Sequence, residues 1–155
     1  MHRIAFIFIL IFCLFIASCN EVYRHHVDDF PNFGWEKQRV LEYDLFIEDS
    51  DSDYELIISF RHIYGFTFES VPVSISIEGS EGKVFESVEN IIVFDSNNKM
   101  LSECAGDYCD LDQALPSPIS FQAPGAYTIS LQHQFEADVL PYVMEVGIIL
   151  DKKDN

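Results

Sequence analysis

The residues of this chain that could do chemistry are its cysteines, its histidines and a short run of alternating aspartates. Asp49, Asp51 and Asp53 are spaced like the start of a calcium-binding loop, in which carboxylates at every second position converge on one cation. The rest of that loop is absent, because its sixth position is Tyr54 rather than glycine and its twelfth is Phe60 rather than glutamate. The spacing therefore favours a solvated hairpin turn and predicts no metal site.

The histidines are spaced too irregularly to indicate a metal site. His25 and His26 are neighbours in a polar N-terminal stretch, whereas His62 and His133 lie in or beside expected strands. Imidazoles bind transition metals when the fold brings two or three together, but this spacing does not require it. Ordinary hydrogen-bonded side chains are expected, with a metal or redox site at His62 or His133 as the weaker alternative.

No pattern in the chain indicates catalysis. We find no Gly-x-Ser-x-Gly turn, no phosphate-binding glycine loop and no His-Glu-x-x-His helix. Pairs of carboxylates are unavoidable in a chain with 26 aspartates and glutamates, so their abundance cannot nominate a general acid or base. The sequence therefore predicts a protein that is not an enzyme and that uses no cofactor.

The N-terminus has the features of an export signal. Arg3 precedes an unbroken apolar run over residues 4–17, which as a helix would span about 21 Å, short of the roughly 30 Å hydrocarbon core. Residues 16–19 also resemble the lipobox of bacterial lipoproteins, in which a diacylglycerol is attached to the cysteine. We therefore expect residues 1–18 to be removed and Cys19 to be lipidated. The alternatives are cleavage near Ala17 that leaves Cys19 free, and an uncleaved anchor.

Removal of that signal leaves 137 of the 155 residues, which is enough for one ordinary domain. The loss of Arg3 changes the formal net charge from −17 to −18. Such a surface repels nucleic acid and anionic head groups, so neither is an expected partner. The acidity favours solubility, or it steers a basic partner or a cation; composition does not choose between them. The expected contact with a membrane is the lipid at Cys19, since two or three acyl chains hold more firmly than one.

Two cysteines remain once Cys13 leaves with the signal and Cys19 is lipidated. Cys104 and Cys109 would pair in the oxidising compartment that an exported chain enters. Their bridge would close a loop of about six residues, worth roughly 2 kcal/mol. A disulfide is expected, with free thiols or a metal or redox pair as alternatives. The four intervening residues do not match the two-residue spacing of redox and zinc pairs.

The rest of the chain has the two-residue period of strands. Residues 19–34 are polar and without periodicity, and we expect them to form a lipidated tether before a domain over residues 35–155. Proline at position 141 limits residues 136–142 to about one helical turn. About seven or eight strands separated by turn residues predict an all-β fold, an antiparallel two-sheet β-sandwich. The expected strands lie at residues 41–47, 54–60, 71–77, 91–94, 119–121, 127–133 and 143–150.

Six aromatic residues lie near the ends of these expected strands: Trp35, Tyr64, Phe66, Phe68, Tyr108 and Tyr142. We single out Trp35, Phe66, Phe68 and Tyr108 as possible partner contacts. Most such side chains pack in the core or at its rim, and the remainder could form a protein contact or a sugar-binding platform.

Several short motifs also follow one another in order along almost the whole mature chain. They are Trp35, Phe46-Ile47-Glu48-Asp49, Tyr54-Glu55-Leu56, Phe60-Arg61-His62, Phe66-Thr67-Phe68, Phe121, Pro124-Gly125-Ala126-Tyr127, Gln132-His133, Leu140 and Val146-Gly147-Ile148. In this order the chain resembles the gliding motility lipoprotein GldH family of Bacteroidetes. It departs from that pattern at Ser70-Val71, where the family tends to carry Asn-Leu, and at residues 104–109, which replace a glycine-rich stretch.

The resemblance implies an envelope lipoprotein needed for gliding over surfaces and associated with the motility and secretion machinery that moves adhesins. It supplies no catalytic residues. The function it implies is a lipid-anchored, non-enzymatic assembly or stabilising component of that machinery, in contact with other gliding or secretion envelope proteins. The outer membrane is preferred to the inner one. The alternative is a surface lipoprotein that binds polysaccharide or another envelope ligand.

Overall fold

The computed structural model describes residues 21–153, which fold almost entirely as strands, turns and loops. One turn of 3-10 helix, η2 (Pro31–Phe33), interrupts them. The all-β class is confirmed, but the expected number of strands was too low. The strands are β1 (Glu21–Val27), β2 (Gly34–Glu36), β3 (Leu41–Ile47), β4 (Asp53–Ile63), β5 (Ser70–Gly79), β6 (Gly82–Ile92), β7 (Glu103–Ala105), β8 (Tyr108–Ala114), β9 (Ile119–Ser120), β10 (Gly125–His133), β11 (Val139–Pro141) and β12 (Val143–Lys152).

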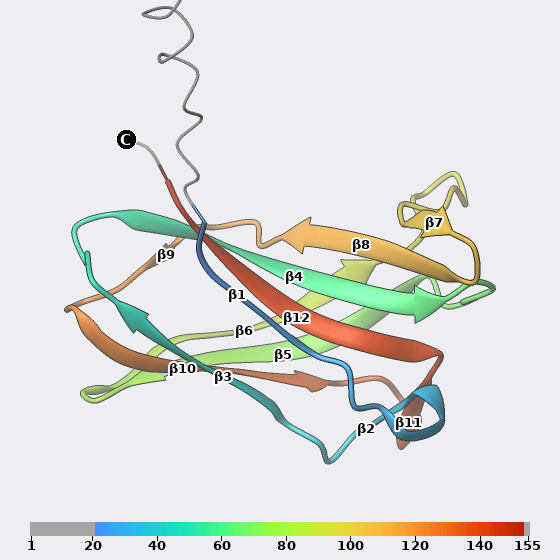
Figure 1. The fold of residues 1–155 in the computed structure, drawn as a ribbon, viewed down its shortest axis with the longest axis horizontal. Coiled ribbons are helices and arrows are strands. Elements are labelled where there is room, and N and C mark those ends of the chain that lie inside the picture. The colour runs from blue at the N-terminus through green and yellow to red at the C-terminus, as the bar shows by residue number, and fades with distance from the viewer. Residues whose placement is uncertain (1–20, 154–155) are drawn as a thin grey trace, which may run out of the picture.

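These strands form two large sheets and one small one, and their pairings are antiparallel. The larger sheet has the order β1-β12-β4-β8-β7, with β9 also beside β4, and the second has the order β3-β10-β5-β6. The two lie one over the other as layers, and β11 pairs with β2 at one end (Figure 1). The core lies between the layers.

Alternation along the strands explains this core. Leu56, Ile58 and Phe60 of β4 are buried, and the residues between them are less so, as expected for a strand with one face against a partner sheet. Burying one such apolar side chain contributes roughly 1.5–3 kcal/mol. One hydrogen bond also joins the layers, because the Tyr43 hydroxyl of β3 donates to the Val146 carbonyl of β12 at 2.9 Å.

Residues 21–27 were expected to belong to a tether, but they form β1 at the edge of the larger sheet. β1 pairs with β12 from Glu21 opposite Asp151 to Val27 opposite Val146. Tyr23 and Val27 pack against the core, and between them His25 lies edge-on to the Tyr43 ring at 5.9 Å. The polar and exposed His25, between the apolar Tyr23 and Val27, is what concealed the period of two.

Two further expectations also need correction. Residues 136–142 contain no helix; they include β11, in which Leu140 pairs with Trp35 of β2. β6 begins at Gly82 rather than near residue 91, because it is an edge strand whose exposed charges, such as Glu86, interrupt the apolar pattern.

Candidate functional site

Four polar side chains form a row across the outer face of the larger sheet, each from a different strand. They are His26 of β1, Glu145 of β12, Arg61 of β4 and Asp110 of β8, and the sheet registers place Arg61 opposite both carboxylates. Arg61 donates from Nε and Nη2 to the two oxygens of Asp110 at 2.6 and 3.2 Å, and from Nη1 to Glu145 Oε2 at 3.3 Å. His26 Nδ1 lies 3.0 Å from Glu145 Oε1. We call these four residues the charged row.

The charged row is an internally paired arrangement rather than a reactive one. A bidentate guanidinium–carboxylate pair is both strong and geometrically specific, and the hydrogen bonds that Arg61 donates to Asp110 raise the pKa of Arg61. The Arg61 guanidinium carbon also lies 4.9 Å from the centroid of the Tyr108 ring, in cation–π geometry. The row therefore holds Tyr108 in place at the start of β8.

Four residues with exposed aromatic side chains belong to segments at one end of the molecule. It is the end where β4 stops and β8 and β12 start (Figure 1). Their exposed fractions are 48% for Phe33, 66% for Tyr64, 38% for Tyr108 and 45% for Tyr142. We call these four residues the aromatic end.

Backbone contacts bring the positions of the three tyrosines together at the ends of three strands. The Ile63 N–H donates to the Tyr142 carbonyl at 3.0 Å, and the Tyr64 N–H donates to the Asp107 carbonyl at 2.9 Å. Ile63 is also the register partner of Tyr108. Tyr108 thus begins β8, Tyr64 directly follows β4 and Tyr142 directly precedes β12, at neighbouring backbone positions.

Phe33 joins this group through the small sheet. Gly34 pairs with Pro141, so Phe33 just before the one and Tyr142 just after the other continue the same antiparallel register. Both have left-handed backbone, with φ of 57° for Phe33 and 68° for Tyr142. For a bulky residue this conformation is an outlier that costs of order 1–3 kcal/mol. The fold therefore keeps two strained aromatic residues at its surface.

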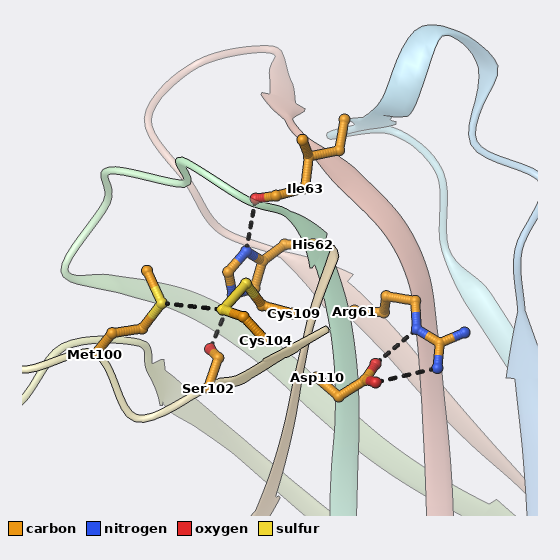
Figure 2. The surroundings of a disulfide bond; sticks show 8 residues. All are labelled: Arg61, His62, Ile63, Met100, Ser102, Cys104, Cys109 and Asp110. Carbon is orange, nitrogen blue, oxygen red and sulfur yellow. Dashed lines mark hydrogen bonds and ion pairs between the residues drawn. A yellow bond between two sulfur atoms is a disulfide. The ribbon is translucent and has the colours of Figure 1, made fainter. Parts of the chain in front are cut away.

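The disulfide closes the hairpin beside this end (Figure 2). Cys104 of β7 and Cys109 of β8 are joined with an S–S distance of 2.03 Å, and Gly106 with φ of 68° makes the turn between them. Cys109 is buried and faces His62 of β4 in the sheet register. The bridge therefore ties the exposed hairpin that precedes Tyr108 to the core.

His62 beside the disulfide is a satisfied core histidine. Its Nδ1 lies 3.0 Å from the Ile63 carbonyl, which can only accept, so Nδ1 carries the proton and Nε2 accepts from Ser102 Oγ at 2.8 Å (Figure 2). Burial lowers its pKa, which keeps the ring neutral. His133 is also buried, edge-on to Trp35 at 5.2 Å, far along the chain. Within residues 21–153, no group of three or more histidines, cysteines or carboxylates is arranged to hold a metal ion.

The carboxylate oxygens of Asp49 accept hydrogen bonds from other groups of the protein. They accept from Lys152 Nζ at 2.5 Å, from the Asp51 N–H at 2.9 Å and from Ser52 Oγ at 3.0 Å. The Lys152 bond above all holds the pKa of Asp49 at about 2. The alternating aspartates thus belong to a turn held by its own side chains. The turn is not the hairpin that the sequence predicted, because β3 and β4 on either side of it lie in different sheets.

Of the four aromatic residues singled out from the sequence, the structure offers only Tyr108 at the surface. Trp35 and Phe66 are buried, so neither can contact a partner. Trp35 donates from Nε1 to the Arg39 carbonyl at 3.0 Å. Phe68 is half-buried, with its ring 4.7 Å from that of Phe135. No pattern in the sequence indicated Phe33, because Tyr142, which continues the register of the small sheet opposite it, lies 109 positions away.

Comparison with known proteins shows the family to which the chain belongs. The family model described as "GldH lipoprotein" matches residues 21–150, from the first residue of β1 almost to the end of β12. The chain belongs to the GldH lipoprotein family. A relative from Christiangramia forsetii, named "Gliding motility lipoprotein GldH homolog", is 25% identical over 97% of this chain and 96% of its own length. The resemblance found in the sequence motifs is thereby confirmed.

A solved structure is also similar to this GldH-family chain. The crystal structure of dimeric latent PorU from Porphyromonas gingivalis matches 88% of this chain but only 14% of its own, with 10% identity and a TM-score of 0.33. At that score the similarity says nothing about function. Cys19, the expected lipidation site, lies outside the described residues. Residues 21–153 include no helix long and apolar enough to span a membrane.

Proposed function

We propose that this GldH-family chain is a lipid-anchored, non-enzymatic component of the gliding motility machinery, and that it stabilises neighbouring gliding or secretion envelope proteins by contact. The observation that carries the proposal is the family match over residues 21–150 directly behind the lipobox-like residues 16–19. The proposed location is the cell envelope, at the outer membrane in preference to the inner one, with Cys19 as the lipidated residue.

The position of β1 supports anchoring close to the membrane. Its first residue, Glu21, already pairs with Asp151 of β12, and only Asn20 separates it from Cys19. Two residues of extended chain span about 7 Å. A lipid on Cys19 would therefore hold this end of the sheet near the bilayer surface.

The titratable groups support a role in contact rather than in reaction. The hydrogen bond with Lys152 lowers the pKa of Asp49, and the hydrogen bond to Asp110 raises the pKa of Arg61. Burial lowers the pKa of His62. Each is a structural pair or a core residue, whereas a catalytic group needs a perturbed pKa together with access to a substrate.

Deletion of the gene followed by complementation tests the proposal. The deletion strain is expected to lose colony spreading and to grow normally, and the wild-type gene is expected to restore spreading. Cys19→Ala is expected to leave spreading lost and to release the protein from the membrane fraction. Cys13→Ala changes a cysteine of the removed signal and serves as the matched control. A deletion strain that spreads normally would refute the proposed function.

A further inference from the structure

We infer that the aromatic end is a docking surface for an envelope protein with a basic surface, and that it faces away from the lipid anchor. This inference rests on the proposed anchoring at Cys19. The surface consists of Phe33, Tyr64, Tyr108 and Tyr142, with the charged row behind it on the outer face of the sheet.

The orientation follows from the pairing of β1 with β12. Glu21 lies opposite Asp151, at the C-terminal end of β12, whereas Tyr142 immediately precedes the first residue of that strand. A ten-residue strand is about 30 Å long. The two ends of β12 are far apart in Figure 1, with the exit of β1 toward the N-terminus near one and the aromatic end at the other. A domain anchored through Cys19 would therefore present the aromatic end to proteins above the bilayer.

The composition of the surface favours a protein partner. Tyrosine, phenylalanine and arginine are the residue types enriched at the centres of protein interfaces, and Tyr64 is two-thirds exposed. Phe33 and Tyr142 are held exposed on left-handed backbone, and strain of this kind concentrates at functional sites. Polysaccharide is less well matched, because the nearby groups that would bind hydroxyls, Arg61 and Asp110, are already paired with each other.

The charges around the surface indicate a basic partner. Arg61 is neutralised by Asp110 and Glu145. Glu103 and Asp107 are exposed on the neighbouring hairpin, and no ion pair is found for either among residues 21–153. The chain as a whole carries a formal charge of −17. A partner with an apolar centre and a basic rim would complement both the rings and the charges.

The first test is colony spreading of the deletion strain complemented with full-length variants. Tyr64→Ala combined with Tyr142→Asn is expected to reduce spreading at least to half, with the protein at its normal level in the membrane fraction. Asparagine tolerates left-handed backbone, so loss of folding is not expected from that substitution. Phe46→Ala is the matched control, because Phe46 is 63% exposed on β3, in the other sheet. Normal spreading by the double variant would overturn the inference.

The second test is photo-crosslinking in intact cells from p-benzoylphenylalanine placed at position 64, with position 46 as control. One discrete protein adduct is expected from position 64 only. In isolated membranes its yield is expected to fall at least threefold with Glu103→Lys and Asp107→Lys, and likewise when salt rises from about 0.05 M to about 0.5 M. An adduct of two copies of this chain, a diffuse glycan adduct, equal yields at both positions or a yield that is insensitive to charge would each overturn the inference.

The two proposals fail in distinguishable ways. Normal spreading with Cys19→Ala would refute the anchor and, with it, the orientation. Lost spreading with Cys19→Ala together with normal spreading by the double tyrosine variant would refute only the docking surface.

Discussion

At the scale of single residues, Tyr142 and Phe33 show where the fold is under strain. Each places a bulky side chain at positive φ on the surface, where glycine or asparagine would be more stable. Retaining an aromatic ring at such a position lowers stability and still leaves 48% of Phe33 and 45% of Tyr142 exposed in the isolated domain. The ring is therefore better explained by a contact outside the domain than by the fold.

Tyr142→Asn is expected to raise the free energy of unfolding by about 1 kcal/mol, because asparagine adopts left-handed backbone at lower cost. Urea denaturation of the purified domain at pH 7.5 measures this. Tyr64→Asn is the control, since Tyr64 is also exposed but does not have positive φ, and it is expected to give no gain. Equal effects of the two substitutions would show that Tyr142 is not strained.

Two buried histidines make stability depend on pH. Burial lowers the pKa of both His62 and His133 below the ordinary 6.5, although the Ile63 and Trp35 backbones respectively oppose the effect. The unfolded chain therefore binds more protons than the folded one in the window below pH 6.5. The contribution of the two neutral histidines to the free energy of unfolding is therefore complete above pH 6.5. It is lost as the pH falls from 6.5 toward the pKa of the folded state.

The free energy of unfolding is thus expected to decrease between pH 7 and pH 5, and less steeply for His133→Phe than for the wild type. Urea denaturation at several pH values gives both slopes, and the range from pH 7.5 to 8.5, where these imidazoles do not titrate, serves as control. A His133→Phe slope equal to that of the wild type between pH 7 and pH 5 would show that His133 does not contribute.

At the scale of elements, β1 is the strand whose attachment matters most, since it follows the proposed anchor. His26 lies over Gly147 of β12, where an added Cβ would come within 2.3 Å of the His26 Nδ1 and 2.7 Å of the His25 carbonyl. Glycine at this position is therefore what lets β1 approach and lets His26 reach Glu145. The charged row depends on a residue without a side chain.

Gly147→Ala is expected to lower the free energy of unfolding by about 1–3 kcal/mol, because overpacking must displace β1. Hydrogen exchange followed by mass spectrometry is expected to show faster exchange over residues 21–27, with β10 as the internal control in the other sheet. Unchanged protection of residues 21–27 would mean that β1 is not held by this close approach.

The elements also show what the sequence could predict. β3, β4, β5, β10 and β12 were found because one face of each is buried and the apolar residues alternate. β1 and β6 were missed because edge strands bury less. The exposed His25 of β1 and the exposed Glu86 of β6 break the apolar pattern. The burial of Trp35 and Phe66 was beyond prediction, since it depends on which sheet covers them.

At the scale of the whole molecule, the aromatic end exists only through the sheet order. Phe33, Tyr64, Tyr108 and Tyr142 come from four segments, and only the pairings of β4 with β8 and β12, and of β2 with β11, bring them together. The pairing of β1 with β12 puts residue 21 at the other end of β12. The fold therefore separates the proposed anchor from the proposed contact by the length of the domain.

The proposed location, orientation and contact all depend on the state of Cys19. The most direct measurement is mass spectrometry of the N-terminal peptide of the protein extracted from the membrane fraction. The expected result is a peptide that begins at Cys19 and carries a diacylglycerol. A peptide that retains residues 1–18, or a Cys19 without lipid, would contradict the account.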